Sequence, residues 1–425
     1  MSWIQNKVEE AFALNAQVDR PEIWIHLRSE EAVLADAARV QRDLDAGLNL
    51  PLAGQIFVAK GNIAIKGYAT TAGCPAFGSV EEEDATVVTL LRDAGAILMG
   101  ATNLDQFATG LVGVRSPYGA VRHAFLPDRI SGGSSSGSAV AVALGIVDFS
   151  LGTDTAGSGR VPAALHGLFG IKPTRGLLSN AGVVPACRSL DCVTIFARDL
   201  ELAQRAFDVA AQFDKKDVYS RQLPEGANSN DSQKVGIPKV GQLGELAPGW
   251  QEQFDATVSK LKPLGFEAIP IDIEPLLTVA QMLYDGAFVA ERYTAVGKFI
   301  DENFDKVDPT VGSIISSAKD IPAHKLYADF DLLATKRLIS DQMFDEVDAI
   351  LLPTTTYHPT LQDLIDEPIT ANSRLGRFTN FANLLDLAAI AFPAGRVGEE
   401  HFGVQLVGKA FSDNRLALIA SKLAE

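Results

Sequence analysis

Short apolar segments alternate with segments of helical periodicity along most of the chain. Apolar runs at 56–59, 96–100 and 193–196 predict buried strands, and the periodic segments 86–94 and 200–211 predict helices. A chain that alternates in this way folds as an α/β protein, in which a large central sheet carries helices on both faces. Further predicted elements are a helix at 139–144, strands at 146–151, 234–238 and 349–353, a helix-rich segment at 275–345, and a polar surface loop at 226–233.

The division into domains follows from the same periodicity. Residues 1–50 carry apolar side chains at helical spacing, which predicts two or three helices packed on the outside of the core. The sequence contains no internal repeat, so a single domain over residues 1–425 is the most economical division.

Charge and apolar run length exclude several classes of partner. The 425 residues carry a formal net charge of −16, which disfavours nucleic acid and anionic membrane surfaces. The longest apolar stretch, 139–147, is far shorter than the roughly 20 residues of a membrane-spanning helix. An anionic substrate would need a local cation in the site, because the net charge of the protein repels it.

The N-terminus and the cysteines indicate a reducing cytoplasm. Glu9 and Glu10 stand where a secretory signal would be apolar. Cys74, Cys187 and Cys192 are odd in number and form no close pair, so neither a disulfide framework nor a zinc site is expected. We expect no metal and no other cofactor, and buried structural roles for the last two cysteines.

The segment Gly132–Ser138 (GGSSSGS) has several interpretations on its own. It could cradle a phosphate at a helix N-terminus, although the Gly-Lys-Ser/Thr of a P-loop is missing. Its Gly133–Gly137 part matches the G-x-S-x-G elbow with Ser135 as nucleophile, but no histidine stands in a recognisable motif. A plain linker is the third interpretation.

A second loop, Gly152–Gly159 (GTDTAGSG), favours catalysis. It follows an apolar run, and its small side chains let a carbonyl group approach the backbone closely. Asp154 is expected to hold this loop in place, and Arg160 to bond to neighbouring carbonyls or to a carboxylate. The N–H groups that could converge on one oxygen as an oxyanion hole are those of Thr155, Ala156, Gly157 and Ser158.

Together the motifs resemble those of the amidase signature family. The resemblance rests on Val58–Ile63 (VAKGNI), Gly132–Ser138 and Gly152–Ser158, and covers nearly the whole chain from about residue 50. It implies a large mixed, twisted β-sheet sandwiched between α-helices, and catalysis without a metal. The resemblance also implies a Ser-Ser-Lys relay with Ser158 as nucleophile, Ser134 as bridging serine and Lys60 as terminal base.

Within that family the chain is most similar to the allophanate hydrolases. This resemblance implies a small anionic amide as substrate, cleavage of the C–N bond of allophanate with release of ammonia, and a homodimer. Many allophanate hydrolases carry a second, C-terminal domain, which we expect this chain to lack. The matching segments are Gly157–Ala163, Lys172–Leu178, Val184–Cys192, Phe378–Ala388 and Phe402–Leu406.

The carboxylate of such a substrate needs a cationic anchor. Tyr284 and Arg292 are eight residues apart on a predicted helix, which places them near the same face two turns apart. An arginine can grip a carboxylate through two hydrogen bonds, and the resemblance supports this pair as ligands, with Gly110 as a backbone contact. Arg188 and Arg377 are rival anchors.

Two alternative functions stay open on the sequence. One is another small-amide hydrolase of the same family, with a carboxybiuret-type substrate. The other is an amidotransferase A-type subunit that delivers ammonia to a partner. In each case Lys60 can act as a base only when it is neutral, which requires burial away from a paired carboxylate.

Overall fold

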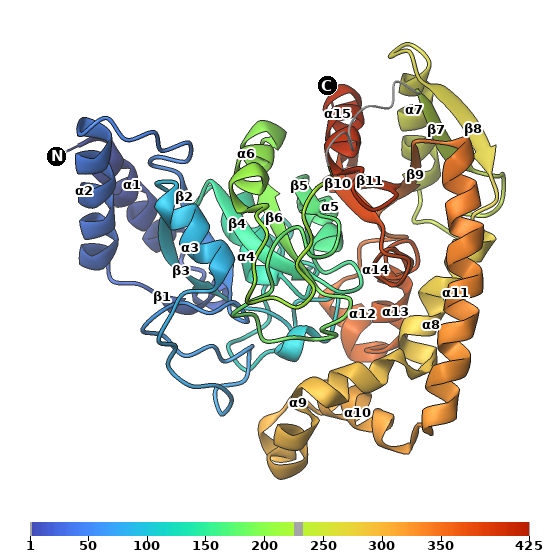
Figure 1. Ribbon diagram of the computed structural model, residues 1–425, viewed down its shortest axis with the longest axis horizontal. Coiled ribbons are helices and arrows are strands. Elements are labelled where there is room, and N and C mark those ends of the chain that lie inside the picture. Colours follow the sequence, from blue (N-terminus) through green and yellow to red (C-terminus); the bar gives the residue numbers. More distant parts are fainter. Residues whose placement is uncertain (1, 225–232, 425) are drawn as a thin grey trace.

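A mixed sheet runs through the computed structural model, which describes residues 2–224 and 233–424 (Figure 1). In this part of the chain the sheet has eleven strands in the order β1-β3-β2-β4-β6-β5-β10-β11-β9-β7-β8. Their bounds are β1 Trp24–Leu27, β2 Ile56–Lys60, β3 Ile97–Thr102, β4 Phe149–Asp154, β5 Phe169–Lys172, β6 Cys192–Ala197, β7 Lys234–Pro238, β8 Glu267–Ile271, β9 Ala349–Pro353, β10 Ala388–Val397 and β11 Glu400–Gly408.

The pairs in the middle of the sheet are antiparallel, as is the edge pair β1–β3, and parallel pairs lie on both sides of the middle. Strands β3, β2 and β4 run parallel to one another, as do β9, β7 and β8. The α-helices are α1 Trp3–Val18, α2 Glu30–Asp45, α3 Thr86–Asp93, α4 Ser136–Ala143, α5 Arg160–His166, α6 Leu200–Ala210, α7 Trp250–Leu261, α8 Glu274–Asp285, α9 Ala290–Glu302, α10 Pro309–Ser316, α11 Ala323–Glu346, α12 Leu361–Asp366, α13 Thr370–Leu375, α14 Asn380–Leu384 and α15 Asp413–Ala424.

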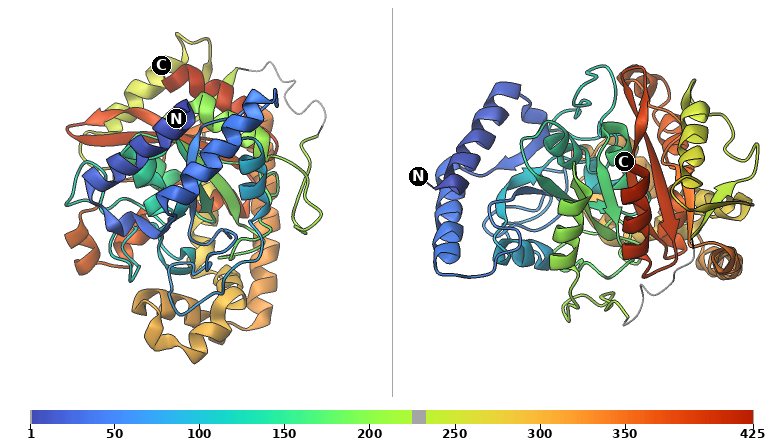
Figure 2. Two further views of the ribbon diagram at one scale, coloured as in Figure 1. Left: turned by 90° about the vertical axis from the view of Figure 1, so that its left-hand side faces the viewer. Right: turned by 90° about the horizontal axis from the view of Figure 1, so that it is seen from above.

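Strand β2 shows why the sheet is covered on both faces. Successive side chains of a strand point to opposite faces. Phe57 and Ala59 pack into one apolar core together with side chains of α3, α6, α7 and α15. Ile56 and Val58 pack into a second core with side chains of α1, α2 and α4. The helices therefore enclose the sheet from both sides (Figure 2), which confirms the predicted α/β sandwich.

The predicted strands and short helices occur within three residues of their expected bounds, and two differences stand out. The strand expected at 146–151 begins only at Phe149, because α4 ends at Ala143 and the chain turns at Gly145, whose φ is +78°. The short edge strand β1 lies inside the segment for which only helices were expected. The predicted polar loop at 226–233 lies outside the described residues apart from Gln233, which is exposed.

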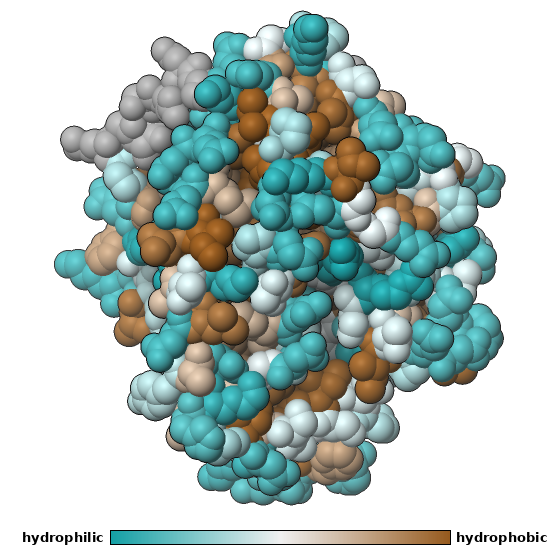
Figure 3. Space-filling model, turned by 90° about the vertical axis from the view of Figure 1, so that its right-hand side faces the viewer, coloured by the Kyte–Doolittle hydropathy of each residue, from teal (hydrophilic) through white to brown (hydrophobic). Residues whose placement is uncertain are grey.

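Helices α1 and α2 lie at one end of the molecule, and α11 lies at the other (Figure 1). On the face shown in Figure 3, hydrophobic residues form separate patches among hydrophilic ones. No helix in the two described ranges is long and apolar enough to cross a bilayer.

Candidate active site

The three residues of the expected relay meet at one edge of the sheet. Strands β2 and β4 are parallel neighbours, with Ala59 beside Leu151, so their carboxyl ends lie at the same edge. Lys60 ends β2, and the loop carrying Ser158 follows β4. The loop carrying Ser134 leads into α4 and has a cis peptide bond between Gly133 and Ser134.

Lys60 is buried, and its Nζ bonds only to hydroxyl groups among the described residues. Its Nζ donates hydrogen bonds to Ser134 Oγ and to Thr153 Oγ1, both at 2.7 Å. No ion pair joins it to any carboxylate of the described residues. Burial, which penalises the ammonium form, lowers the pKa of Lys60 to about 7, although the more distant charges of Asp105 and Asp191 oppose this shift. Lys60 therefore has the environment that a neutral base requires.

Ser158 lies beside a backbone carbonyl of the predicted substrate-binding loop. Its Oγ donates to Gly110 O at 3.5 Å, and within the described ranges it makes no hydrogen bond to Ser134. The elbow candidate, Ser135, is engaged differently. Its Oγ donates to Thr153 O at 3.1 Å and accepts from Thr153 N at 3.2 Å, which ties the first loop to β4. This pairing favours a structural role for Ser135.

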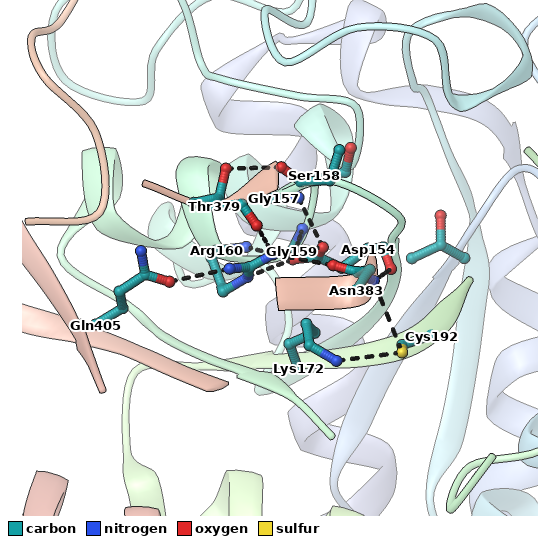
Figure 4. Close-up of polar contacts among 12 residues, drawn as sticks. Asp154, Gly157, Ser158, Gly159, Arg160, Lys172, Cys192, Thr379, Asn383 and Gln405 are labelled. Atoms are coloured by element: carbon teal, nitrogen blue, oxygen red, sulfur yellow. Dashed lines mark hydrogen bonds and ion pairs between the residues drawn. The ribbon is translucent and has the colours of Figure 1, made fainter. Parts of the chain in front are cut away.

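The carboxylate of Asp154 holds the second loop by accepting hydrogen bonds from backbone N–H groups of that loop (Figure 4). Its Oδ1 accepts from Gly157 N at 2.7 Å, and its Oδ2 accepts from Gly159 N at 3.1 Å. The N–H of Gly157 is thus already engaged, which corrects its assignment to the oxyanion hole. The N–H groups of Thr155, Ala156 and Ser158 have no acceptor among the described residues, and so remain free to bind an oxyanion.

A buried ion pair anchors the same loop. Arg160 Nε lies 2.9 Å from Asp154 Oδ2, and both side chains are fully buried. Burial, the largest single influence, would raise the pKa of Asp154, but the charge and hydrogen bond of Arg160, the charge of Lys172 and the hydrogen bond from Gly157 together lower it. Arg160 also donates to Gln405 Oε1 at 3.0 Å and to Asn383 Oδ1 at 3.2 Å, so that it links the loop to β11 and α14 (Figure 4). The prediction that Arg160 binds a carboxylate is confirmed.

Tyr284 and Arg292 lie side by side, but not on one helix. Helix α8 ends at Asp285, the chain turns at Gly286, and α9 begins only at Ala290. A Cβ on Gly286 would lie 2.4 Å from Met282 O, so a larger residue does not fit this break. Across it, Arg292 Nη2 donates to Tyr284 OH at 3.3 Å.

Arg292 supplies a buried cation beside the loop that ends at Gly110. It is 1% exposed, and its Nη1 donates to Ala108 O at 3.3 Å and to Thr109 Oγ1 at 3.0 Å. Its Nε has no partner among the described residues. A fully buried guanidinium with an unused donor is suited to binding a small anion.

Of the two rival anchors only Arg377 lies near Tyr284, and both cysteines are buried. Arg188 is exposed and lines a separate cavity with Asp191, whereas Arg377 lines the same cavity as Tyr284. Burial raises the pKa of Cys187 to about 12, which disfavours the thiolate that a nucleophile requires. Cys192 is also buried, with a raised pKa, and accepts from Lys172 Nζ at 3.4 Å.

Sequence reasoning missed three polar residues around the relay. Thr153 accepts from Lys60, as described above. Asp105 Oδ2 accepts from Val112 N at 3.1 Å. This bond helps to hold the loop that contains Gly110, whose carbonyl lies next to Ser158. Asp191 Oδ1 accepts from Thr155 Oγ1, and burial raises the pKa of Asp191 to about 6. Only Thr153, inside the glycine-rich loop motif, offered a signal in the sequence.

Comparison with known proteins decides the family. The sequence matches the amidase family over residues 8–417. The chain belongs to the amidase signature family. This confirms the resemblance expected from the two loops and Lys60, and as a family member the chain is a hydrolase that acts on amides.

Individual relatives refine this picture. The chain is 46% identical over 423 residues to the urea amidolyase of Lachancea kluyveri, which aligns with 96% of this chain but only 23% of that protein. It is 34% identical over 450 residues to the A-type subunit of the glutamyl-tRNA(Gln) amidotransferase from Legionella pneumophila subsp. pneumophila, over 98% of this chain and 90% of that protein. The solved structure of Kluyveromyces lactis allophanate hydrolase superposes with a TM-score of 0.93 at 41% identity, over 99% of this chain and 70% of that chain.

Proposed function

We propose that the chain hydrolyses the amide C–N bond of allophanate, releases ammonia and leaves N-carboxycarbamate. The observation that carries this proposal is the hydroxyl-bound, buried Lys60 in the same molecule as the buried Arg292, which donates to the half-buried Tyr284. The first supplies a base for an acyl transfer, and the second supplies a cation for a carboxylate. The likeness to an allophanate hydrolase supports the same substrate.

The chemistry begins with proton transfer along the relay. Ser134 passes the proton of Ser158 to neutral Lys60, since a hydroxyl can donate and accept at once. The oxygen of Ser158 attacks the terminal carbonyl carbon of allophanate, whose oxygen becomes negatively charged. The free N–H groups of the second loop stabilise that oxygen.

The C–N bond then breaks. The relay returns the proton to the leaving nitrogen, which departs as ammonia, and an acyl group remains on Ser158. Water, activated by the same base, attacks this ester, restores the serine and releases N-carboxycarbamate. The product can lose carbon dioxide and a second ammonia without further help from Ser158.

A substrate panel tests the proposal. The purified protein is incubated with allophanate, biuret and simple amides, and ammonia is quantified. Ammonia from allophanate, at a rate well above the other amides, is the expected result. Ammonia from simple amides but none from allophanate would contradict the substrate and favour the carboxybiuret-type alternative or another small amide.

A second candidate follows from the similarity to the A-type amidotransferase component over nearly its full length. A protein with that role would show little hydrolysis in isolation and would co-purify with a partner. Turnover by the isolated chain decides against it. The homodimer and the cytoplasmic location are predictions that accompany the hydrolase proposal, and the mass in solution tests the first.

A further inference from the structure

A cavity of about 400 Å³ adjoins the proposed carboxylate anchor, Tyr284 and Arg292. Tyr284 forms part of its wall, and the hydroxyl of the same tyrosine accepts the hydrogen bond from buried Arg292. Other residues of its wall come from α13, α14 and the turn between them, including Arg374, Arg377 and Asn380. Tyr284 therefore separates an open cavity from the buried guanidinium.

Two polar groups on this wall lack partners. Arg377 Nη2 donates to Gln242 O at 3.2 Å, but its Nε is buried and makes no hydrogen bond within the described residues. Asn380 is 6% exposed, and its Oδ1 likewise has no partner there. A buried donor and a buried acceptor facing one cavity cost free energy unless a ligand or water completes them.

The charged residues of the wall differ in their exposure to water. Arg374 lies with its guanidinium carbon 4.0 Å from the ring centroid of Tyr357, and among the described residues neither Arg374 nor Arg377 forms an ion pair. Glu245, Asp285 and Arg374 are exposed, so water screens their charges, whereas Arg377 is only partly exposed and its charge is the least screened of the four.

We propose that Arg377 and Asn380 form an outer subsite that binds the ureido-carboxylate substrate before it reaches Arg292. Arg377 binds the carboxylate, and Asn380 Oδ1 accepts an N–H of the ureido group. This inference rests on the proposed function, since it requires an anionic substrate. It gives a protein of net charge −16 a local cation for a small anion, since Arg377 forms no ion pair among the described residues.

Steady-state ammonia release from allophanate tests the subsite. Arg377→Gln should lower kcat/KM about tenfold, leave kcat within about twofold, and weaken the dependence of kcat/KM on ionic strength. Arg377→Lys should recover part of the loss, since it keeps the charge. Arg205→Gln, on the exposed side of α6, is the matched control and should leave all three quantities unchanged. Equal kcat/KM values for wild type, Arg377→Gln and Arg205→Gln would overturn the subsite.

A binding measurement separates this inference from the proposed function. Wild type that releases no ammonia from allophanate contradicts the function but leaves the subsite testable. Titration calorimetry with malonate, a small dicarboxylate probe, then compares the same variants. Arg377→Gln should weaken malonate binding about tenfold, whereas Arg205→Gln should not. Identical dissociation constants would overturn the subsite whatever the substrate.

Discussion

The Nζ of Lys60 and the Oγ of Ser134 lie 2.7 Å apart, although 74 residues separate them in the chain. The contact exists because Lys60 ends β2 at the same edge of the sheet where the loop with Ser134 leads into α4. Burial and the lack of an ion pair among the described residues keep the pKa of this lysine near neutrality. The proposed relay depends on this contact, and its consequences can be measured.

The first consequence is a pH dependence of activity. The base is active only when Lys60 is deprotonated, and its pKa is about 7. We therefore expect kcat/KM to rise with pH through about 7 and then level off, which a pH–rate profile of ammonia release measures. Lys60→Met should abolish turnover across the whole range. A profile that stays flat from about pH 6 to about pH 9 would contradict the role of Lys60.

The second consequence concerns stability. The unfolded lysine keeps its proton to higher pH than the folded one, so the stability contributed at this site increases as pH rises from about 7 towards 10. Relative to Lys60→Met, the wild type should gain as much as about 5 kcal/mol of unfolding free energy over that range. Urea denaturation of both proteins at several pH values measures the difference. A constant difference would mean that folding does not shift this pKa.

The third prediction concerns the second acceptor of Lys60. Thr153→Val removes the hydroxyl that lies 2.7 Å from Nζ and keeps the side-chain shape. Loss of this hydrogen bond should lower kcat/KM about tenfold, because it weakens the positioning of the base. The control is Thr194→Val, since the buried hydroxyl of Thr194 has no partner among the described residues. If both variants behave alike, Thr153 has no special part in the relay.

Much of the fold and part of this site could be predicted from the sequence. Lys60, Ser134 and Ser158 were expected because their motifs resemble those of the amidase signature family, and the structure brings Lys60 and Ser134 into contact. Asp154 was expected to hold the second loop, and its Oδ1 does accept from Gly157 N three residues further on; the sequence did not say which N–H group it would bind. Contacts across the fold, such as Asp191 with Thr155, carry no local signal at all.

The helix break was missed for a related reason. Eight residues between Tyr284 and Arg292 fit two turns of one helix, and helical periodicity continues on both sides of Gly286. A single glycine is tolerated in many helices, so it did not mark the break. The side chains of Tyr284 and Arg292 are still in contact, because only a short turn separates α8 from α9.

The fourth prediction tests the buried ion pair. Asp154→Asn leaves Arg160 as an uncompensated charge at a fully buried position, and should cost about 3–5 kcal/mol of unfolding free energy. Because the pKa of Asp154 is lowered in the fold, this contribution is present at neutral pH and is lost as pH falls through the folded value. Chemical denaturation measures it. Glu83→Gln, which breaks the exposed pair with Lys216, should have little effect, and an equal loss in both variants would contradict the role of the buried pair.

The fifth prediction concerns the turn of the oxyanion loop. Gly157 has φ +125°, and a Cβ there would lie 2.3 Å from Thr379 Oγ1. Gly157→Ala should therefore displace the loop and lower kcat at least tenfold. Gly398→Ala also introduces a side chain at positive φ, but no atom lies within 4 Å of its Cβ, so its effect on kcat should be negligible. Equal kcat values for the two variants would show that the close approach to Thr379 is unimportant.

The central claim is that Ser158, and not the elbow candidate Ser135, forms the acyl-enzyme. The most direct measurement is ammonia release from allophanate by wild type, Ser158→Ala and Ser135→Ala, each shown by circular dichroism to be folded. We predict that Ser158→Ala abolishes turnover while Ser135→Ala keeps a measurable rate. Turnover that persists in Ser158→Ala and disappears in Ser135→Ala would contradict the assignment of the nucleophile.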